Sequence, residues 1–401
     1  MVTIRVSSNG RYFVDGEGKP FFWLGDTQWE LFRCFSLADA RTVLERRKSQ
    51  GFTVIQVMIT GVGDGTKPSA AGETPWVGGE PASPNEAYFR NVDSVVEIAG
   101  ECGLILVMGI FHQLQRQRIT CANARPYARW IAQRYRNAPN VVWTMYPEAT
   151  LEYLPVLREL AAGLREGDDG AHLITVHPDP SPTSSSFIHE EDWLTFNMIQ
   201  TCVHYELIYG MVSEDYARTP TKPTVMAEGG YEGAEFGKDL KVVKALDIRK
   251  QAYWSYLAGG HHSYGHNDNW VSPSTWRSWI DSPGALHLGV CKRVLTALGD
   301  WWNLVPDQSL FAAGEGSGLT LNVAARSSTG NWVLAYLSSC TPVTISMDAI
   351  RGVATAEASW IDPTDGAKTR LGRFPTKGTR EFSPPSPWDD ALLLLEPPAR
   401  Q

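Results

Sequence analysis

The chain has 401 residues, of which 43% are hydrophobic and 20% charged, so it can bury a large core and extensive disorder is not expected. A formal net charge of −8 disfavours nucleic-acid binding, which a basic surface patch would support. The N-terminus lacks an apolar signal core, and no run approaches about 20 apolar residues, so we expect a cytoplasmic protein without a membrane span.

The opening segment alternates apolar and polar residues around DGEGKP, which is typical of a hairpin loop. After it, short apolar runs alternate with longer stretches of helical period. Runs this apolar are typical of strands buried on both faces, as in a parallel sheet. The runs predict eight strands, at 21–27, 53–59, 104–111, 141–146, 173–178, 195–201, 224–230 and 259–265.

The stretches between these runs predict helices. The first has Ser36 as N-cap and Gly51 as its stop, and the weakest, within 186–193, predicts only a short helix. Strands that alternate with helices eight times indicate an α/β fold, a closed (β/α)8 TIM barrel. The alternative is a doubly wound open sheet, but no strand is followed by a glycine-rich phosphate-binding loop.

From residue 307 on, the segments become short, alternating and bounded by turns. This pattern predicts a small antiparallel β-sandwich. We therefore expect two domains that pack directly on each other. They are a barrel with its N-terminal hairpin at 1–306 and an accessory sandwich at 307–401.

Two glutamates stand where a barrel carries catalytic groups, at the carboxyl ends of strands. Glu148 ends the fourth predicted strand and Glu228 the seventh. Carboxylates at these places face each other across the mouth of a barrel. A retaining glycosidase needs such a pair about 5 to 5.5 Å apart, one as nucleophile and one as acid and base. We predict this role for both, the alternatives being a structural ion pair for Glu228 and a helix cap for Glu148.

Other polar and aromatic residues near the same strand ends are candidates for holding a sugar. Aromatic rings can stack on the apolar faces of sugars. Asp26 could grip two hydroxyl groups, or it could cap the turn that follows it. The predicted substrate-binding residues are Asp26, Gln28, Trp29, His112, Tyr146, His177, Gln200, His204, Tyr231, His262, Tyr264 and Trp270.

Several histidines fall near the predicted mouth, which raises a metal site as a further possibility. None shows the HExxH spacing, and the neighbours His261 and His262 would point to opposite faces of a strand. The six cysteines are scattered without a CxxC pair. We therefore predict neither a metal nor another cofactor.

Three segments resemble one known family. They are NGRYFVDGEGKPFFWLGDTQWELF at 9–32, KPTVMAEGGYEG at 222–233 and DIRKQAYWSYLAGGHHSYGHNDNW at 247–270. They resemble the apiosidase-like proteins, glycoside hydrolase family 140, also called domain of unknown function 4038. GFTVIQVMI and DWLTFNMIQT add further similarity, and DALLLLE resembles the end of the small β domain that is named for collagen binding in these proteins.

The resemblance implies a (β/α)8 barrel, a retaining mechanism and exo-action on a furanoside such as apiose or arabinose. By position it implies Glu228 as nucleophile and Glu148 as acid/base. The family usually has an Asp after two glycines at the latter place, where this chain has Tyr146-Pro147-Glu148. It more often has Glu-Pro at the nucleophile, where this chain has Glu228-Gly229.

These observations favour a glycoside hydrolase that acts on a small carbohydrate, without nucleic acid or membrane as a partner. A transglycosidase would use the same carboxylates, with a sugar hydroxyl in place of water. Two further alternatives are a non-catalytic carbohydrate-binding barrel and a histidine-dependent metallohydrolase. No pattern in the sequence predicts an oligomeric state.

Overall fold

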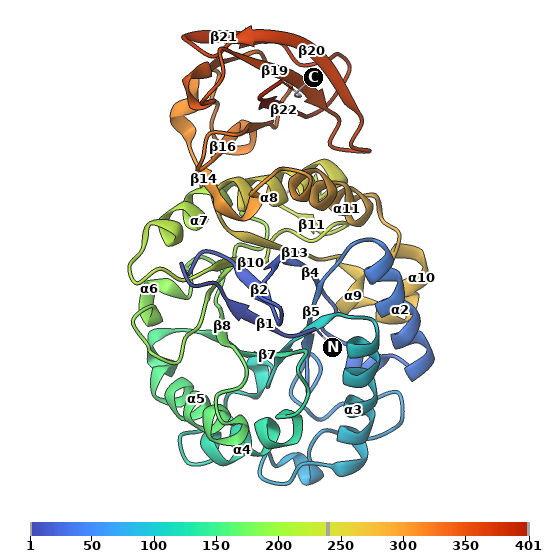
Figure 1. Ribbon diagram of the computed structural model, residues 1–401. Coiled ribbons are helices and arrows are strands. Elements are labelled where there is room, and N and C mark those ends of the chain that lie inside the picture. The colour runs from blue at the N-terminus through green and yellow to red at the C-terminus, as the bar shows by residue number, and fades with distance from the viewer. Residues whose placement is uncertain (1, 238–240, 399–401) are drawn as a thin grey trace.

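The computed structural model describes residues 2–237 and 241–398, apart from the side chains of residues 147–149. Eight parallel strands form one sheet in the order β8-β7-β6-β5-β4-β13-β10-β9. Figure 1 looks down the ring that they form, with helices on its outside. The strands are β4 (Leu24–Thr27), β5 (Val54–Met58), β6 (Ile105–Gly109), β7 (Val141–Ala149), β8 (Ile174–Pro178), β9 (Asn197–Gln200), β10 (Thr224–Glu228) and β13 (His261–Tyr264). Each of these strands overlaps one of the eight predicted runs.

Threonine side chains join the first and last strands of this order. Thr195, just before β9, donates its backbone N–H to the Ile174 carbonyl at 2.9 Å, and its Oγ1 donates to the same oxygen at 2.8 Å. Thr175 Oγ1 in β8 donates to the Phe196 carbonyl at 2.8 Å. These bonds occupy backbone groups at the seam between β8 and β9. The TIM barrel predicted from the strand pattern is confirmed.

Helices cover the outside of the ring, and the first long one ends as predicted. Ser36 Oγ accepts the Asp39 N–H at the N-cap, and Gly51 follows with a φ of 102°, which favours glycine. The weak segment near 186 forms only the four-residue α6. The helices are α1 (Leu31–Cys34), α2 (Leu37–Ser49), α3 (Glu86–Glu101), α4 (Ala124–Tyr135), α5 (Leu154–Asp168), α6 (Ser185–Ile188), α7 (Ile208–Ala217), α8 (Ala245–Leu257), α9 (Asp268–Val271), α10 (Trp276–Trp279) and α11 (Pro283–Thr296).

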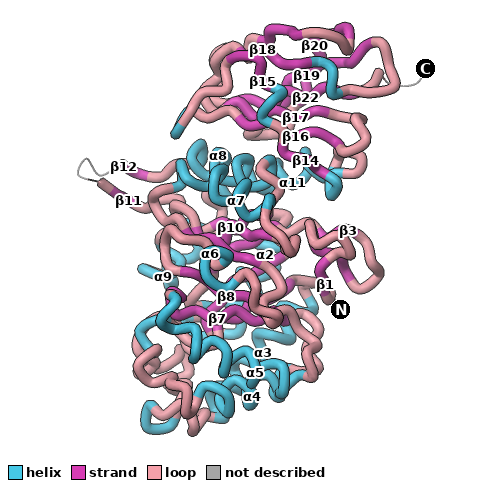
Figure 2. The backbone as a smooth tube through the Cα atoms, turned by 90° about the vertical axis from the view of Figure 1, so that its left-hand side faces the viewer, coloured by secondary structure: helices cyan, strands magenta, loops and turns pink. Residues whose placement is uncertain are grey.

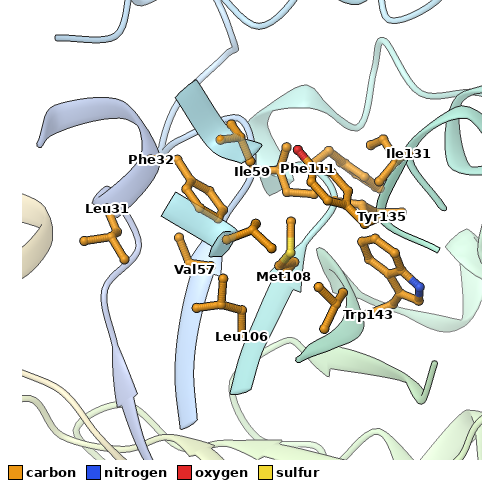
Figure 3. Packing of buried hydrophobic residues seen from close by; sticks show 14 of the residues in the cluster. Leu31, Phe32, Val57, Ile59, Leu106, Met108, Phe111, Ile131, Tyr135 and Trp143 are labelled. Atoms are coloured by element: carbon orange, nitrogen blue, oxygen red, sulfur yellow. The ribbon is translucent and has the colours of Figure 1, made fainter. Parts of the chain in front are cut away.

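The buried faces of these helices meet the outer faces of the strands in two large apolar clusters. Figure 3 shows part of one cluster, where Val57 of β5 and Met108 of β6 lie between Phe32 of α1 on one side and Tyr135 of α4 on the other. No helix in the described part of the chain is long and apolar enough to cross a membrane.

A small antiparallel sheet closes one end of the barrel. It comprises β1 (Ile4–Val6), β2 (Phe13–Asp15) and β3 (Pro20–Phe21), the last two joined by the predicted DGEGKP hairpin. Figure 1 shows β1 and β2 across the centre of the ring. The Phe13 ring lies 4.9 Å from that of Trp23 and 5.2 Å from that of Phe196. Apolar side chains thus fill this end of the barrel.

The C-terminal residues form a sandwich of a six-stranded sheet, β14-β16-β17-β22-β19-β20, and a three-stranded sheet, β15-β18-β21. Its strands are β14 (Leu304–Pro306), β15 (Phe311–Ala313), β16 (Val323–Ser327), β17 (Val333–Leu337), β18 (Val343–Ser346), β19 (Thr355–Ile361), β20 (Lys368–Pro375), β21 (Thr379–Phe382) and β22 (Ala391–Glu396). Figure 2 shows the sandwich seated on the side of the barrel formed by α8 and α11. A two-stranded ribbon, β11 (Glu235–Phe236) and β12 (Lys241–Val242), follows β10.

Helix α8 carries the contact between the two domains. Tyr253 stacks on Tyr336 of β17, with ring centroids 4.5 Å apart. Arg249 Nε and Nη2 each lie 2.7 Å from an oxygen of Asp390, which also accepts the Tyr336 hydroxyl at 2.8 Å. Both members of the ion pair are almost fully buried. Because each carboxylate oxygen has a partner, the charge pair is tolerated in this interface.

Replacing Arg249 with Ala leaves the Asp390 carboxylate buried without its counter-ion. We expect a loss of about 3 to 5 kcal/mol in the free energy of unfolding, measured by urea denaturation. Arg370, which is exposed and pairs with the half-buried Glu357, provides the control, and Arg370→Ala is expected to cost about 1 kcal/mol or less. Equal effects of the two substitutions would contradict a structural role for the buried pair.

Candidate active site

A pocket of about 310 Å³ opens where the barrel strands end, opposite the small N-terminal sheet. Its wall takes residues from the end of every barrel strand or the loop that follows it. The lining residues are Trp29, Met58, Val62, His112, Gln113, Tyr146, Pro180, Gln200, Cys202, Val203, Glu228, Gly229, Gly230, Tyr231, Ala234, Asn267 and Trp270. This is the face on which TIM barrels place their functional groups.

An irregularity in β10 turns Glu228 toward this pocket. Along the strand, Val225 and Ala227 pack in the barrel interior, whereas Met226 packs outward against the helices. Strict alternation would place Glu228 on the outward face with Met226. The pairing of β10 with β9 shifts between Met226 and Glu228, so that Glu228 pairs with Gln200. A bulge of this kind re-aims the next side chain, and Glu228 becomes a lining residue.

The loop after Glu228 is held by Gln251 of α8. Gln251 Oε1 accepts the Gly230 N–H at 2.8 Å, and its Nε2 donates to the Gly230 carbonyl at 3.1 Å. A Cβ at Gly229 would overlap Gln251 Oε1. The close approach of this side chain therefore explains the glycine that directly follows Glu228.

His177 of β8 lies beneath the Glu228 carboxylate and is fully buried. Its Nδ1 is 3.2 Å from the Pro178 carbonyl, which can only accept, so Nδ1 carries a hydrogen. Its Nε2 is 3.3 Å from Glu228 Oε2, and neither atom has an aligned hydrogen-bond partner among the described residues. His177 thus supports the Glu228 carboxylate from the barrel interior.

Aromatic residues form one deep wall of the pocket. Trp29 Nε1 donates to the Tyr231 hydroxyl at 2.7 Å, and the Trp29 and Tyr146 rings are 5.4 Å apart. Burial, and next the charge of Glu228, raise the pKa of Tyr231 well above its usual value, so this phenol stays neutral. The wall presents flat aromatic rings, each with a large apolar face, beside the Glu228 carboxylate.

Two polar side chains complete the deep part. Burial lowers the pKa of His112 to about 4, and its Nδ1 accepts the Leu114 N–H at 3.2 Å, so the neutral ring carries its hydrogen on Nε2. Gln200 Nε2 donates to the Cys202 sulfur at 3.2 Å. Gln200 Oε1 is buried and has no hydrogen-bond partner among the described residues, so this amide is only partly satisfied within the protein.

Seven of the sequence-predicted residues are brought together in this pocket. They are Trp29, His112, Tyr146, Gln200, Glu228, Tyr231 and Trp270. His177 contacts Glu228 from below without lining the pocket. Glu148 lies at the end of β7, but its side chain is outside the described part of the structure.

Asp26 and Gln28 do not line the pocket, because they point outward from the ring. Asp26 Oδ2 is 2.7 Å from Arg47 Nε of α2 and accepts the Gln28 side-chain N–H at 2.6 Å. Arg47 and Asp26 are completely buried. Burial raises the pKa of Asp26, although Arg47 opposes the shift. Asp26 forms an internal ion pair that joins β4 to α2.

His262, Tyr264 and His204 also lie away from the pocket. His262 and Tyr264 are on the outward face of β13, where the Tyr264 hydroxyl donates to Glu232 Oε2 at 2.7 Å. Burial lowers the pKa of His262 to about 3, so its ring is neutral against Ser255. The side chain of His204 is 67% exposed and pairs with Glu206. Closeness to a strand end in the sequence therefore does not tell whether a side chain points into the pocket or away from it.

Some lining residues were absent from the sequence prediction. Gln113 and Asn267 lie near His112 and Trp270 in the chain, so their polar side chains were a usable signal. Met58, Val62, Pro180, Val203 and Ala234 are apolar residues whose role in a wall depends on the path of the loops. Among the described residues, no group of three or more His, Cys, Asp or Glu side chains is arranged to hold a metal ion.

Two family models match this chain. The family model "Apiosidase-like, catalytic domain" matches residues 7–303, and "Putative collagen-binding domain of a collagenase" matches residues 305–396. Curated proteins give no match.

Solved structures share the architecture. A protein named glycoside hydrolase has a TM-score of 0.91 and 24% identity, with 100% of this chain and 98% of that chain covered. A glycoside hydrolase family 5 protein from Bacteroides vulgatus has a TM-score of 0.91 and 25% identity, with 100% and 94% covered. A family 5 mannosidase from Rhizomucor miehei has a TM-score of 0.50 and 14% identity over 66% of this chain and 85% of its own.

Gly229→Ala tests the packing behind Glu228. The added methyl group must displace Gln251 and break its two hydrogen bonds to Gly230, so we expect a loss of about 1 to 3 kcal/mol in the free energy of unfolding. Gly210→Ala in α7 is the control, because a Cβ there meets nothing within 4 Å. It is expected to be neutral or to stabilise by up to about 1 kcal/mol. A neutral Gly229→Ala would show that Gln251 does not fix this loop.

Proposed function

The chain belongs to the apiosidase-like family and is a glycosidase, and we propose that it is a retaining, exo-acting enzyme that releases a terminal sugar. In this proposal Glu228 is the nucleophile and Glu148 is the acid/base. The observation that carries it is the bulge in β10, which places the Glu228 carboxylate in the wall of a pocket at the carboxyl end of the barrel.

The positions of β7 and β10 are compatible with a pair of carboxylates across the mouth of the barrel. In the ring these strands are separated by β8 and β9, so residues at their ends can reach over the mouth from two sides. A retaining mechanism requires carboxyl groups about 5 to 5.5 Å apart. Glu228 would attack the anomeric carbon while Glu148 protonates the leaving oxygen. Glu148 would then take a proton from the water that releases the sugar.

The size and chemistry of the pocket support exo-action. A volume of about 310 Å³ is at the lower end of the range for ligand pockets, roughly 300 to 1,000 Å³, and suits a terminal sugar better than a long chain. Gln200 and His112 offer hydrogen bonds to hydroxyl groups, while Trp29 and Tyr146 offer apolar faces. The apiosidase-like family description favours apiose as the released sugar. Another furanoside, such as arabinose, is the alternative that we propose to test.

The substitutions Glu228→Gln and Glu148→Gln test the carboxylate pair. Glu228→Gln removes the nucleophile, so hydrolysis in a screen of aryl pyranosides and furanosides should fall below detection. Glu148→Gln removes acid catalysis and should lower kcat by about 10²- to 10⁴-fold. Glu206→Gln is the control, since Glu206 pairs with His204 outside the pocket lining.

Proton NMR of the first product should show the anomeric configuration of the substrate. An inverted product would contradict the retaining mechanism. Full activity of Glu228→Gln would contradict the assignment of the nucleophile.

Gln200→Leu tests whether the buried Oε1 accepts a sugar hydroxyl. The variant should lower kcat/KM by about 10- to 100-fold, because that hydroxyl would be left unpaired in the pocket. With a series of monodeoxy glycosides of the released sugar, the penalty should disappear for the one that lacks the bonded hydroxyl. An equal penalty for every deoxy substrate would show that Gln200 acts through the fold and not through the sugar.

A further inference from the structure

The pocket wall divides into a deep part, which holds hydrogen-bonding groups among aromatic rings, and an outer part in which apolar side chains predominate. The deep residues Trp29, His112, Tyr146, Gln200 and Tyr231 are each at most 8% exposed and include the hydrogen-bonding groups beside Glu228. The outer residues are half-buried or exposed. They are Val62, Gln113, Pro180, Cys202, Val203, Ala234, Asn267 and Trp270.

The outer apolar side chains reach the opening from five different loops. Val62 follows β5, Pro180 follows β8, Val203 follows β9, Ala234 follows β10 and Trp270 follows β13. Trp270 is 45% exposed, which is a large apolar surface to leave in water at the entrance of a pocket. The preceding residue, Asn269, is anchored by its side chain, which donates to Thr27 Oγ1 at 3.0 Å.

Building on the proposed function, we propose that this outer wall binds an apolar aglycone. The deep part would hold the terminal sugar and Val62, Val203, Ala234, Pro180 and Trp270 would surround an aromatic or alicyclic group attached to it. The substrate class is then the glycosides of apolar alcohols and phenols.

The alternative occupant, a second sugar of an oligosaccharide, fits this wall less well. A sugar can stack on one face of Trp270, but its hydroxyl groups would meet the aliphatic side chains of Val62, Val203 and Ala234 without partners. Gln113 and Asn267 are the two amide side chains of the outer wall among its described residues.

An acidic group next to the sugar is disfavoured as well. Among the described lining residues none is Lys or Arg, and Glu228 contributes a carboxylate. A uronic acid would therefore bring a second negative charge near Glu228 with no cation in the lining to compensate it. The lack of a cation in the described lining and the apolar outer wall therefore both favour a neutral, apolar group next to the sugar.

Methyl and benzyl glycosides of the released sugar separate the aglycone contact from the chemistry. Methanol and benzyl alcohol have nearly equal acidity, so the bond to be broken is similar and the phenyl ring is the difference. We expect kcat/KM to be about 10- to 100-fold higher for the benzyl glycoside, as burial of one ring predicts. A cyclohexylmethyl glycoside should share this advantage if apolar area matters, and should lose it if the contact is purely aromatic stacking.

Two variants test the wall itself. The nearly isosteric Val203→Thr should reduce the benzyl-to-methyl ratio while hydrolysis of the methyl glycoside stays within about threefold of wild type. Trp270→Ala should reduce the same ratio. Val203→Thr covers the case in which Trp270→Ala does not fold. Leu286→Ala on α11 is the control, because Leu286 is also exposed but lies outside the pocket lining.

The outcomes distinguish this inference from the proposed function. If wild type cleaves both glycosides at equal kcat/KM, or cleaves a disaccharide of the same sugar better than the benzyl glycoside, the aglycone site is wrong while the glycosidase remains. If a full sugar screen gives no hydrolysis, the proposed function fails and the aglycone site with it.

Discussion

The candidate site depends on one slip in the pairing of two strands. On a regular β10, Glu228 would follow Met226 outward into the apolar layer under the helices, where a charged carboxylate is costly. The slip between Met226 and Glu228 turns the side chain to the pocket instead. The Glu228 carbonyl then accepts the Thr201 N–H at 2.9 Å, and Gln56 Nε2 donates to the Ala227 carbonyl at 2.8 Å. These bonds give the irregular backbone partners, so the arrangement can persist.

Helix α8 connects this arrangement to the rest of the protein. On one side Gln251 holds the backbone of Gly230, two residues after Glu228. On another side Arg249 and Tyr253 pair with Asp390 and Tyr336 of the sandwich. The accessory domain therefore braces the helix that holds the loop of the proposed nucleophile. This contact gives the sandwich a structural role that is independent of any ligand of its own.

The overall architecture could be predicted from the sequence because the order of apolar and polar residues along the chain reflects which positions are buried. Each of the eight apolar runs contains or overlaps a barrel strand, and the Ser36 cap and the DGEGKP hairpin follow from local chemistry. The site could be predicted only in part. Strand ends identify the mouth of the barrel, but not which face of a strand a residue occupies. Asp26 and Tyr264 therefore lie in outward contacts although they follow the same rule as Trp29.

The remaining features of the site have no local signature. The slip in β10 arises from its pairing with β9, in which Glu228 pairs with Gln200, a residue distant in the sequence. The need for a glycine at position 229 becomes clear only from the position of the Gln251 side chain in the fold. Val62, Val203 and Ala234 are ordinary apolar residues until the loops bring them around one opening. Long-range packing, and not residue type, decides these roles.

Covalent trapping tests the central claim most directly. A 2-deoxy-2-fluoro glycoside of the released sugar, with a good leaving group, should inactivate a retaining enzyme by accumulating the glycosyl-enzyme. Mass spectrometry of peptides should then find the sugar on Glu228. A label on another carboxylate would contradict the account of the bulge. Turnover with inversion and without any labelled peptide would contradict the retaining mechanism itself.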